Sequence, residues 1–426
     1  MNKREWFRME NAGKLYGSVI SERTTTFYRF SVTLKSPVDV SILTVALELT
    51  FKRFPYFNVI RKKGFFWNYF EKNSMVRVVE QEKFYPCTHS DDEQYPLNVF
   101  YFNSRISLEI MHGLTDGYGA TTFLKKLMEV YAALLLNFEY YSNYYTTLFE
   151  AEIDELEVED GFINNHIRRF HLPSQKARKA MHLPFKKNKK GVYYVTTGYI
   201  DVKTVKSEAK KYGATISEYL LALYFETLFD YIKKQPYLKR KLLTKKPVSL
   251  NVPVDLRSFY PSKTMWNFFI TIIPTIETKY GYYEFDEIID YVKYFFKSKI
   301  HKRFLNSEIK QVIAHSNNIF NRLIPLMLKD MILPILYSRI GEGTYTSGFS
   351  NLGLMKFDEE ADKLIETLEF YPPPSDLNKI KVGVIAVKDK IAITFGSLCH
   401  DTEIEKMYFR KLVAQGIPVK IESNRG

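Results

Sequence analysis

The feature that most constrains this chain is a junction between a strand and a helix that contains a histidine. Residues 98–111 have the pattern of two strands that turn near Asn103-Ser104, and residues 120–136 carry apolar side chains at helical spacing. The junction between them reads Met111-His112-Gly113-Leu114-Thr115-Asp116-Gly117. Because the hairpin and the helix each need to bury an apolar face, the sequence predicts a mixed α/β fold with His112 between two core elements.

His112 is expected to point inward at the end of its strand. Side chains alternate between the two faces of a strand, so Ile106, Leu108 and Ile110 share a face with His112. The next residue, Gly113, allows a backbone segment or a substrate to approach closely. The pattern therefore favours an imidazole that faces a cleft at the strand terminus.

The chemistry of an imidazole and a nearby carboxylate suggests a catalytic site. An imidazole with its ordinary pKa of about 6.5 is suited to accept a proton from a hydroxyl, amine or thiol group. Asp116 lies four residues after His112, and Gly117 permits the bend into the helix. Asp116 could orient the imidazole, as in a catalytic triad, or it could pair with an arginine and fix the turn. The second arrangement is favoured, because side chains at the two ends of a tight loop often diverge.

Strands and helices alternate in two successive stretches, which indicates two domains. At 426 residues the chain is too long for one ordinary hydrophobic core. Residues 150–160 hold seven acidic side chains, and the basic residues 166–179 follow them. Such a shift in composition is typical of a crossover, so we expect one domain over residues 1–180 and another over residues 181–426.

Hydrophobic periodicity predicts further elements in both halves. In the first half we expect strands over 25–34 and 65–70 and a helix over 40–54. In the second half we expect strands over 192–200, 248–254, 267–274, 345–349, 365–371, 381–387 and 390–395. Helices are expected over 202–212, 216–232, 284–299 and 402–413, and a long helical region is expected over 308–336.

Composition bears on the compartment and on membrane insertion. The two cysteines, Cys87 and Cys399, cannot form a disulfide framework, and the N-terminal residues lack the apolar stretch of a secretory signal. We therefore expect a cytoplasmic location. Residues 323–336 are apolar but are interrupted by Lys329, Asp330 and two prolines, so no integral membrane segment is expected.

The formal net charge of +13 favours an anionic partner. The basic runs lack the interleaved aromatic residues of a nucleic-acid module, so we expect no nucleic-acid partner. The sequence has no P-loop, dinucleotide fingerprint or Gly-x-Ser-x-Gly elbow. Its histidines show no ligand-like cluster, and we expect no metal site.

The motif His112-x-x-x-Asp116-Gly117 resembles the signature of CoA-dependent acyltransferases of the chloramphenicol acetyltransferase superfamily. This group includes alcohol acetyltransferases, plant BAHD enzymes, polyketide-associated acyltransferases and condensation domains of peptide synthetases. Other blocks resemble family blocks and follow the family's order: ENAGKLY at 10–16, GATIS at 213–217, NVPVDLR at 251–257, WNF at 266–268 and SNLG at 350–353. Together these blocks cover nearly the whole chain.

The resemblance implies a fold and a site. The fold would consist of two chloramphenicol acetyltransferase-like domains with mixed sheets and a channel between them. Acyl-CoA would be the co-substrate, a small alcohol or amine would accept the acyl group, and no cofactor would be bound. His112 would be the general base, with Asp116, its ion-pair partner Arg257, and Gly117 as structural residues. The candidates for the channel wall and the oxyanion donor are Asn267, Ser350 and Asn351.

Two departures from the family pattern indicate which subgroups this chain resembles less, and a third concerns the shape of the channel. Condensation domains usually carry a second histidine before the motif, where this chain has Met111, which favours a free-standing acyl-CoA enzyme. The late Asp-Phe-Gly-Trp-Gly block of the plant enzymes is absent. Trp266 replaces the glycine usual before Asn267, which alters the expected shape of the channel there. Two alternatives stay open, namely an acyl carrier protein as the donor and a non-catalytic ligand-binding paralogue.

Overall fold

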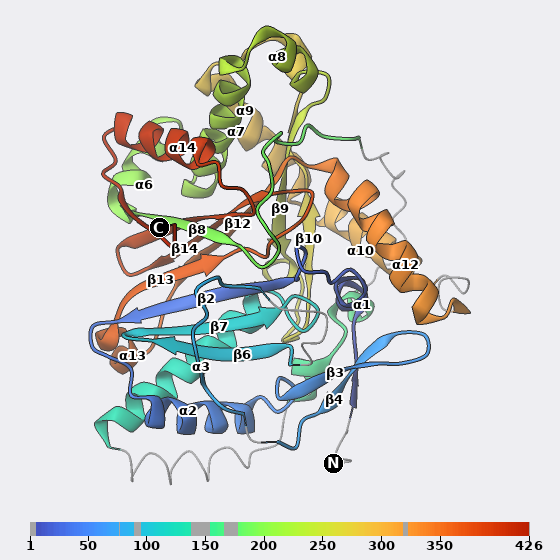
Figure 1. Cartoon of the computed structure of the whole chain (residues 1–426), viewed down its shortest axis with the longest axis vertical. Coiled ribbons are helices and arrows are strands. Elements are labelled where there is room, and N and C mark those ends of the chain that lie inside the picture. Colours follow the sequence, from blue (N-terminus) through green and yellow to red (C-terminus); the bar gives the residue numbers. More distant parts are fainter. Residues whose placement is uncertain are drawn as a thin grey trace.

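The computed structural model describes residues 6–75, 77–88, 95–137, 154–165, 178–317 and 323–425. These residues form a mixed α/β structure with three β-sheets, and the two larger sheets lie next to each other (Figure 1). The expected α/β fold class is thereby confirmed. Most of the basic segment 166–179, and residues 150–153 of the acidic one, lie outside the described residues.

The first large sheet is built around the hairpin that ends next to His112. Its strand order is β13-β2-β7-β6-β5, and β7 pairs in antiparallel fashion with β2 and β6. Helices α2 and α3 pack against one face, and Ile106, Leu108 and Ile110 are buried in the core on that side. The bounds are β2 Phe27–Leu34, α2 Val40–Arg53, β5 Glu80–Gln81, β6 Leu97–Phe102, β7 Arg105–Met111, α3 Gly117–Leu136, α13 Glu359–Leu364 and β13 Ile365–Tyr371.

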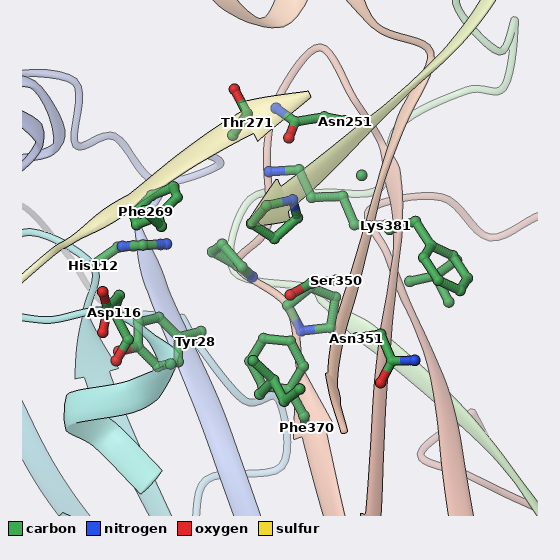
Figure 2. Close-up of a pocket in the computed structure, with 18 of the residues that line it drawn as sticks. Tyr28, His112, Asp116, Asn251, Phe269, Thr271, Ser350, Asn351, Phe370 and Lys381 are labelled. Carbon is green, nitrogen blue, oxygen red and sulfur yellow. The ribbon is translucent and has the colours of Figure 1, made fainter. Parts of the chain in front are cut away.

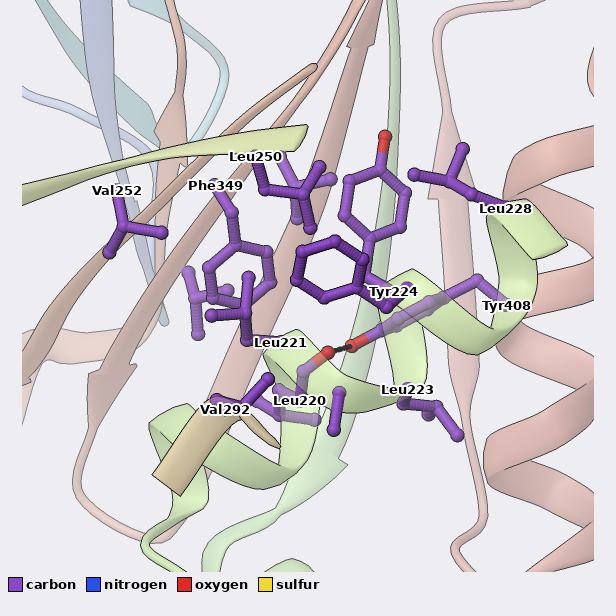
Figure 3. Close-up of a cluster of buried hydrophobic side chains, with 14 of the residues drawn as sticks. Leu220, Leu221, Leu223, Tyr224, Leu228, Leu250, Val252, Val292, Phe349 and Tyr408 are labelled. Carbon is purple, nitrogen blue, oxygen red and sulfur yellow. Dashed lines mark hydrogen bonds between the residues drawn. The ribbon is translucent and has the colours of Figure 1, made fainter. Parts of the chain in front are cut away.

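The second large sheet has eight strands in the order β10-β9-β12-β14-β15-β8-β16, with β11 paired to β9. The long helix α7 lies on it, and Figure 3 shows its residues Leu220, Leu221 and Tyr224 among side chains of the sheet and of α9 and α14. The strands are β8 Tyr194–Asp201, β9 Val248–Asp255, β10 Phe269–Ile272, β11 Thr275–Ile276, β12 Ser347–Met355, β14 Ile380–Val387, β15 Lys390–Ser397 and β16 Lys420–Ser423. The helices are α6 Val202–Lys211, α7 Ile216–Lys234, α8 Tyr237–Leu243, α9 Phe285–Lys299 and α14 Glu403–Ala414.

A small third sheet and a group of helices flank the two large sheets (Figure 1). The sheet has the order β1-β4-β3, with β1 Trp6–Arg8, β3 Val59–Lys63 and β4 Asn68–Lys72. The remaining helices and turns are α1 Asn11–Ser18, η1 Glu155–Val158, α5 Gly161–Asn164, η2 Leu256–Ser258, η3 Thr278–Tyr280, α10 Lys302–Asn317, α12 Leu326–Leu336, η4 Tyr337–Gly341 and η5 Glu342–Thr344. Within the described residues, no helix combines the length and the apolar character that crossing a membrane requires.

Strand β13 connects the two large sheets. It follows β12 in the second half of the chain, yet it pairs with β2 at the edge of the first sheet. It also crosses β14 closely, because a Cβ atom added to Gly383 would lie 2.5 Å from the carbonyl oxygen of Phe370. The boundary between two domains expected at residue 180 stays a prediction. The pairing of β13 with β2 shows that residues 365–371, from the second half of the chain, belong to the first sheet.

Most expected elements are present, and one strand differs for a local reason. The strand expected over 65–70 begins at Asn68, because Gly64 donates its N–H to the carbonyl of Trp67 and residues 64–67 form a hairpin tip. Within the helical region expected over 308–336, the described residues include the end of α10 and the whole of α12, which begins after Pro325. Ser350 and Asn351 lie within β12, directly before the strand shifts register.

The first sheet buries a charged cluster opposite its apolar core. Arg29 of β2 is 1 % exposed, and its Nε lies 2.6 Å from Oε1 of Glu109 on β7. Arg29 also forms an ion pair with Glu82, which Arg105 contacts at 2.9 Å. A buried carboxylate that loses its cation is costly, so this cluster ties the strands that carry His112 to their neighbours.

Replacing Arg29 by methionine tests this cluster. Arg29→Met removes the buried cation that contacts Glu109 and Glu82, and we expect the free energy of unfolding to fall by about 3 kcal/mol. Lys190→Met is the control, because Lys190 pairs with Glu22 in an exposed ion pair and should change stability little. Urea unfolding of both variants measures the difference, and equal midpoints would show that the cluster does not hold the sheet.

Candidate active site

A cavity of about 320 Å³ lies where the two large sheets meet. Its wall includes Tyr28 and Phe370 from the first sheet and Asn251, Phe269 and Lys381 from the second (Figure 2). The residues at the start of α3 and the turn η4 complete the wall. Of the residues singled out from the sequence, the cavity brings together His112, Asp116, Gly117, Ser350 and Asn351, whereas Arg257 and Asn267 lie behind its wall.

Three aromatic rings hold the imidazole of His112 at the end of β7. Tyr16 stacks on it with 4.4 Å between the ring centroids, while Tyr28 and Phe269 lie at 5.2 and 5.3 Å. The ring lies beside the cavity and Nδ1 lies 3.1 Å from Oδ1 of Asn267. These contacts leave the imidazole few orientations.

The contacts of Asn267 determine which nitrogen of His112 carries the proton. The amide nitrogen of Asn267 donates to Oε1 of Glu10 at 2.6 Å and to the carbonyl of His112 at 3.0 Å. Its Oδ1 is therefore the atom that faces the imidazole, and an amide oxygen can only accept a hydrogen bond. Nδ1 must then be the protonated nitrogen, which leaves the lone pair on Nε2.

The electrostatic surroundings favour the neutral form of His112. Burial lowers the pKa of His112 below 6.5, against the smaller opposing effects of its own backbone carbonyl, the Asp116 charge and the Asn267 hydrogen bond. The positive charge of Lys381 acts in the same direction as burial. A neutral imidazole with a free lone pair is the form that can accept a proton.

Glu10 is the buried end of this hydrogen-bonded chain. It caps the N-terminus of α1 by accepting from the backbone N–H groups of Ala12 and Gly13, both at 2.6 Å. Burial raises the pKa of Glu10 to about 8, although these hydrogen bonds and that of Asn267 favour its ionised form. A Cβ atom on Gly13 would lie 2.5 Å from the carbonyl oxygen of Gly113, so a glycine is needed where α1 passes the histidine turn.

Both carboxylate oxygens of Asp116 accept hydrogen bonds from groups other than the imidazole of His112. Oδ1 accepts from the N–H groups of Tyr118 and Gly119 and caps α3. Oδ2 accepts from Nη1 of Arg257 at 2.9 Å and from the N–H of Phe268 at 2.8 Å. The carboxylate therefore joins the first turn of α3 to the segment that follows β9.

Arg257 and Gly117 support the same junction. Nη2 of Arg257 donates to the carbonyls of Thr264 at 2.9 Å and Trp266 at 2.6 Å, which fixes the loop before Asn267. A Cβ atom on Gly117 would lie 2.7 Å from a methyl carbon of Leu352, so β12 can approach α3 closely only at a glycine. Arg257 itself has only 6 % of its side chain exposed.

Ser350 and Asn351 line the cavity from β12, but they differ in their contacts. The amide of Asn351 donates to Oγ of Ser217 at 2.8 Å and accepts from the N–H of Gly353. Among the described residues, the hydroxyl of Ser350 has no hydrogen-bond partner. Ser350 is thus the candidate whose donor is available to a ligand, while both amide hydrogens of Asn267 already have acceptors.

Sequence reasoning missed two polar residues that the structure places at the site. Glu10 was noticed only as part of a family block, because its partner Asn267 lies 257 residues away. Lys381 extends into the cavity toward Asn251 (Figure 2). Its ammonium group lies 3.9 Å from the buried carboxylate of Glu342. A signal for Lys381 exists in the sequence, since it is the one charged residue in the apolar strand 380–387.

Comparison of the sequence with models of known protein families finds no match, and no curated protein matches it either. Solved structures do match over nearly the whole chain. TRI101 of F. graminearum, in complex with coenzyme A and T-2 mycotoxin, has a TM-score of 0.64 at 10 % identity, over 97 % of this chain and 99 % of the other. Polyketide synthase associated protein 5 of Mycobacterium tuberculosis has a TM-score of 0.60 at 11 % identity, over 97 % and 98 %.

Condensation domains are among the structures that match. The starter condensation domain of rhizomide synthetase RzmA, in complex with C8-CoA and Leu-SNAC, has a TM-score of 0.55 at 10 % identity, over 96 % of this chain and 93 % of the other. At these identities the likeness concerns the fold. The chain therefore has the two-domain fold of CoA-dependent acyltransferases and condensation domains, as its sequence motifs had indicated.

Proposed function

We propose that this protein transfers an acyl group from acyl-CoA to an alcohol or amine, with His112 as the general base. The observation that carries the proposal is the fixed imidazole beside the cavity. Asn267 holds the proton on Nδ1, which leaves Nε2 as the basic atom of a ring whose protonation is disfavoured by burial. The proteins of the same fold that are described with bound coenzyme A support the choice of donor.

The geometry supports a direct transfer. Nε2 of His112 takes the proton of the acceptor O–H or N–H as the acceptor oxygen or nitrogen attacks the thioester carbonyl carbon. A tetrahedral intermediate forms, and the bond between carbon and sulfur then breaks. The CoA thiolate leaves and takes the proton back from the imidazolium. The base is restored, and one ester or amide and one free thiol are produced.

The oxyanion of that intermediate needs a hydrogen-bond donor. Ser350 is our candidate, because its hydroxyl faces the cavity and has no partner among the described residues. Lys381 provides positive charge in the same cavity, although Glu342 partly compensates it. Asp116, Arg257 and Gly117 act in this proposal as positioning residues.

The alternative donor is an acyl carrier protein, because condensation domains share the fold. Met111 in place of a second histidine favours free acyl-CoA. Turnover with purified acyl-CoA and a panel of small alcohols and amines, measured by release of free thiol, supports the first donor. Turnover only with an acyl carrier protein supports the second, and saturable binding without any thiol release supports a non-catalytic role.

The first prediction from this mechanism concerns the general base, His112. His112→Ala should reduce acyl transfer by about 10³-fold or more, because it removes the general base of the proposed reaction. His400→Ala is the matched control, since His400 is exposed and lies outside the cavity, and its activity should equal that of the wild type. Both variants should unfold at the wild-type temperature, and thiol release by His112→Ala at the wild-type rate would exclude the proposed mechanism.

A second prediction tests how much the orientation of the imidazole by Asn267 contributes to kcat while the imidazole itself is kept. Asn267→Leu removes the acceptor for Nδ1–H, and we expect kcat to fall about 10²-fold while KM for acyl-CoA changes little. A residue that merely supports the fold would instead lower the yield of active protein without changing its kcat. Active-site titration together with kcat and KM distinguishes these outcomes.

The third prediction concerns pH. Because burial lowers the pKa of His112 below 6.5, the neutral base persists to lower pH than in a free imidazole. The acid limb of kcat/KM should therefore have its midpoint below pH 6.5. Asn267→Leu should move this midpoint further down, since the lost hydrogen bond favours the protonated form. An acid limb above pH 6.5 would contradict the assignment of His112 as the base.

A further inference from the structure

Helix α12 exposes a stripe of large apolar side chains. Met327, Met331 and Ile335 recur every four residues, so they lie on one side of the helix, and they are 77, 64 and 55 % exposed. Ile340 in the following turn is also exposed. The side of a surface helix that faces water normally carries polar residues, so this stripe is typical of a contact surface.

The tip of the β3–β4 hairpin extends this stripe. Phe65 and Phe66 are exposed at the tip. The N–H of Leu326 donates to the carbonyl of Phe65 at 2.8 Å, and Nζ of Lys329 donates to the carbonyl of Phe66 at 2.9 Å. The hairpin tip and α12 therefore form one surface. We name this surface the apolar platform and define it by Phe65, Phe66, Met327, Met331, Ile335 and Ile340.

Positive charge surrounds the apolar platform. The segments 62–67 and 323–340 contain four cationic residues against one anionic residue, and three of the cations, Lys62, Lys63 and Arg339, are not buried, whereas Lys329 is 4 % exposed. Two of the cations, Lys62 and Lys63, precede the aromatic tip and are separated from it by Gly64, and Arg339 is exposed beside Ile340. Aromatic and apolar side chains flanked by lysine and arginine are the composition that suits the interface between lipid headgroups and acyl chains.

We propose that the apolar platform docks on the surface of a bilayer that contains anionic phospholipids. The 11 residues of α12 extend about 16 Å, roughly half the thickness of the hydrocarbon core, so the helix fits in the plane of the headgroups. The cations then face phosphate groups while the apolar side chains enter the acyl region.

The charge distribution disfavours a second copy of this chain as the occupant. A symmetric dimer brings the same patch of both subunits together, so a net positive surface would meet another net positive surface. Like charges in such a contact oppose association. An anionic lipid surface satisfies both the apolar and the basic character of the platform.

Docking would also place the bilayer close to the cavity. Helix α12 continues directly into η4, and Tyr337 of η4 lines the cavity, with its ring centroid 6.5 Å from that of Tyr16. A lipid-soluble acceptor or acyl chain would thus leave the membrane next to one wall of the cavity. The docking itself does not depend on the proposed acyl transfer, and it can be tested without an activity assay.

Vesicle flotation of the full chain tests the proposal. Vesicles of equal parts phosphatidylglycerol and phosphatidylcholine should bind the wild type at least about 10-fold more tightly than vesicles of phosphatidylcholine alone, because several cations lie at the platform. The double variant Met331→Glu with Ile335→Glu should lose at least about 10-fold in affinity for the anionic vesicles. Lys62→Gln with Lys63→Gln should reduce the preference for the anionic vesicles.

A matched control is available on α8, where Leu238 and Leu242 are 75 and 64 % exposed. The double variant Leu238→Glu with Leu242→Glu adds the same charge and removes similar apolar area outside the platform. This control variant should keep most of the wild-type affinity for the anionic vesicles. The proposal is overturned if the wild type binds neither vesicle or if both double variants lose affinity equally. Another outcome that overturns it is a wild-type protein that binds no vesicles and is a dimer by light scattering, while only the Met331→Glu with Ile335→Glu variant is a monomer.

Discussion

The carboxylate of Asp116 holds the two halves of the site together. One oxygen caps α3, which begins directly after the histidine turn, and the other accepts from Arg257 and from the backbone of Phe268. Because Asn267 immediately precedes Phe268, this one side chain places the amide that orients His112. The charge of Asp116 is buried, so losing its cation or its backbone donors would be costly, and the junction is correspondingly rigid.

This arrangement divides the functions of the motif residues. His112 faces the cavity, with its proton held on Nδ1 by Asn267, whereas Asp116 acts on the backbone that carries Asn267. Glu10 completes the chain from the other side, since it accepts from Asn267 and caps α1. Burial keeps the imidazole neutral through its lowered pKa, and the surrounding aromatic rings keep it in place. In the proposed reaction, the base is thus prepared before any substrate binds.

Local patterns were sufficient to predict the part of the site that lies within one strand-to-helix turn. Strand parity placed His112 beside the core, and the short turn predicted that Asp116 would face away from the imidazole. The family blocks indicated Arg257 as the partner. The role of Asn267 could not be predicted in this way, because its two amide hydrogens are directed by Glu10 and by the backbone of His112, far away in the sequence. Likewise, no local pattern shows that β13 pairs with β2.

The proposed acyl transfer requires that His112 is neutral and protonated on Nδ1, so that Nε2 is the base. Long-range ¹H–¹⁵N correlation spectra of protein labelled with ¹⁵N-histidine, assigned by comparison with His112→Ala, measure this directly at neutral pH. We expect a pyrrole-like Nδ1 and a pyridine-like Nε2 for His112, and loss of this fixed pattern in Asn267→Leu. A protonated Nε2 with an unprotonated Nδ1 in the wild type would contradict it.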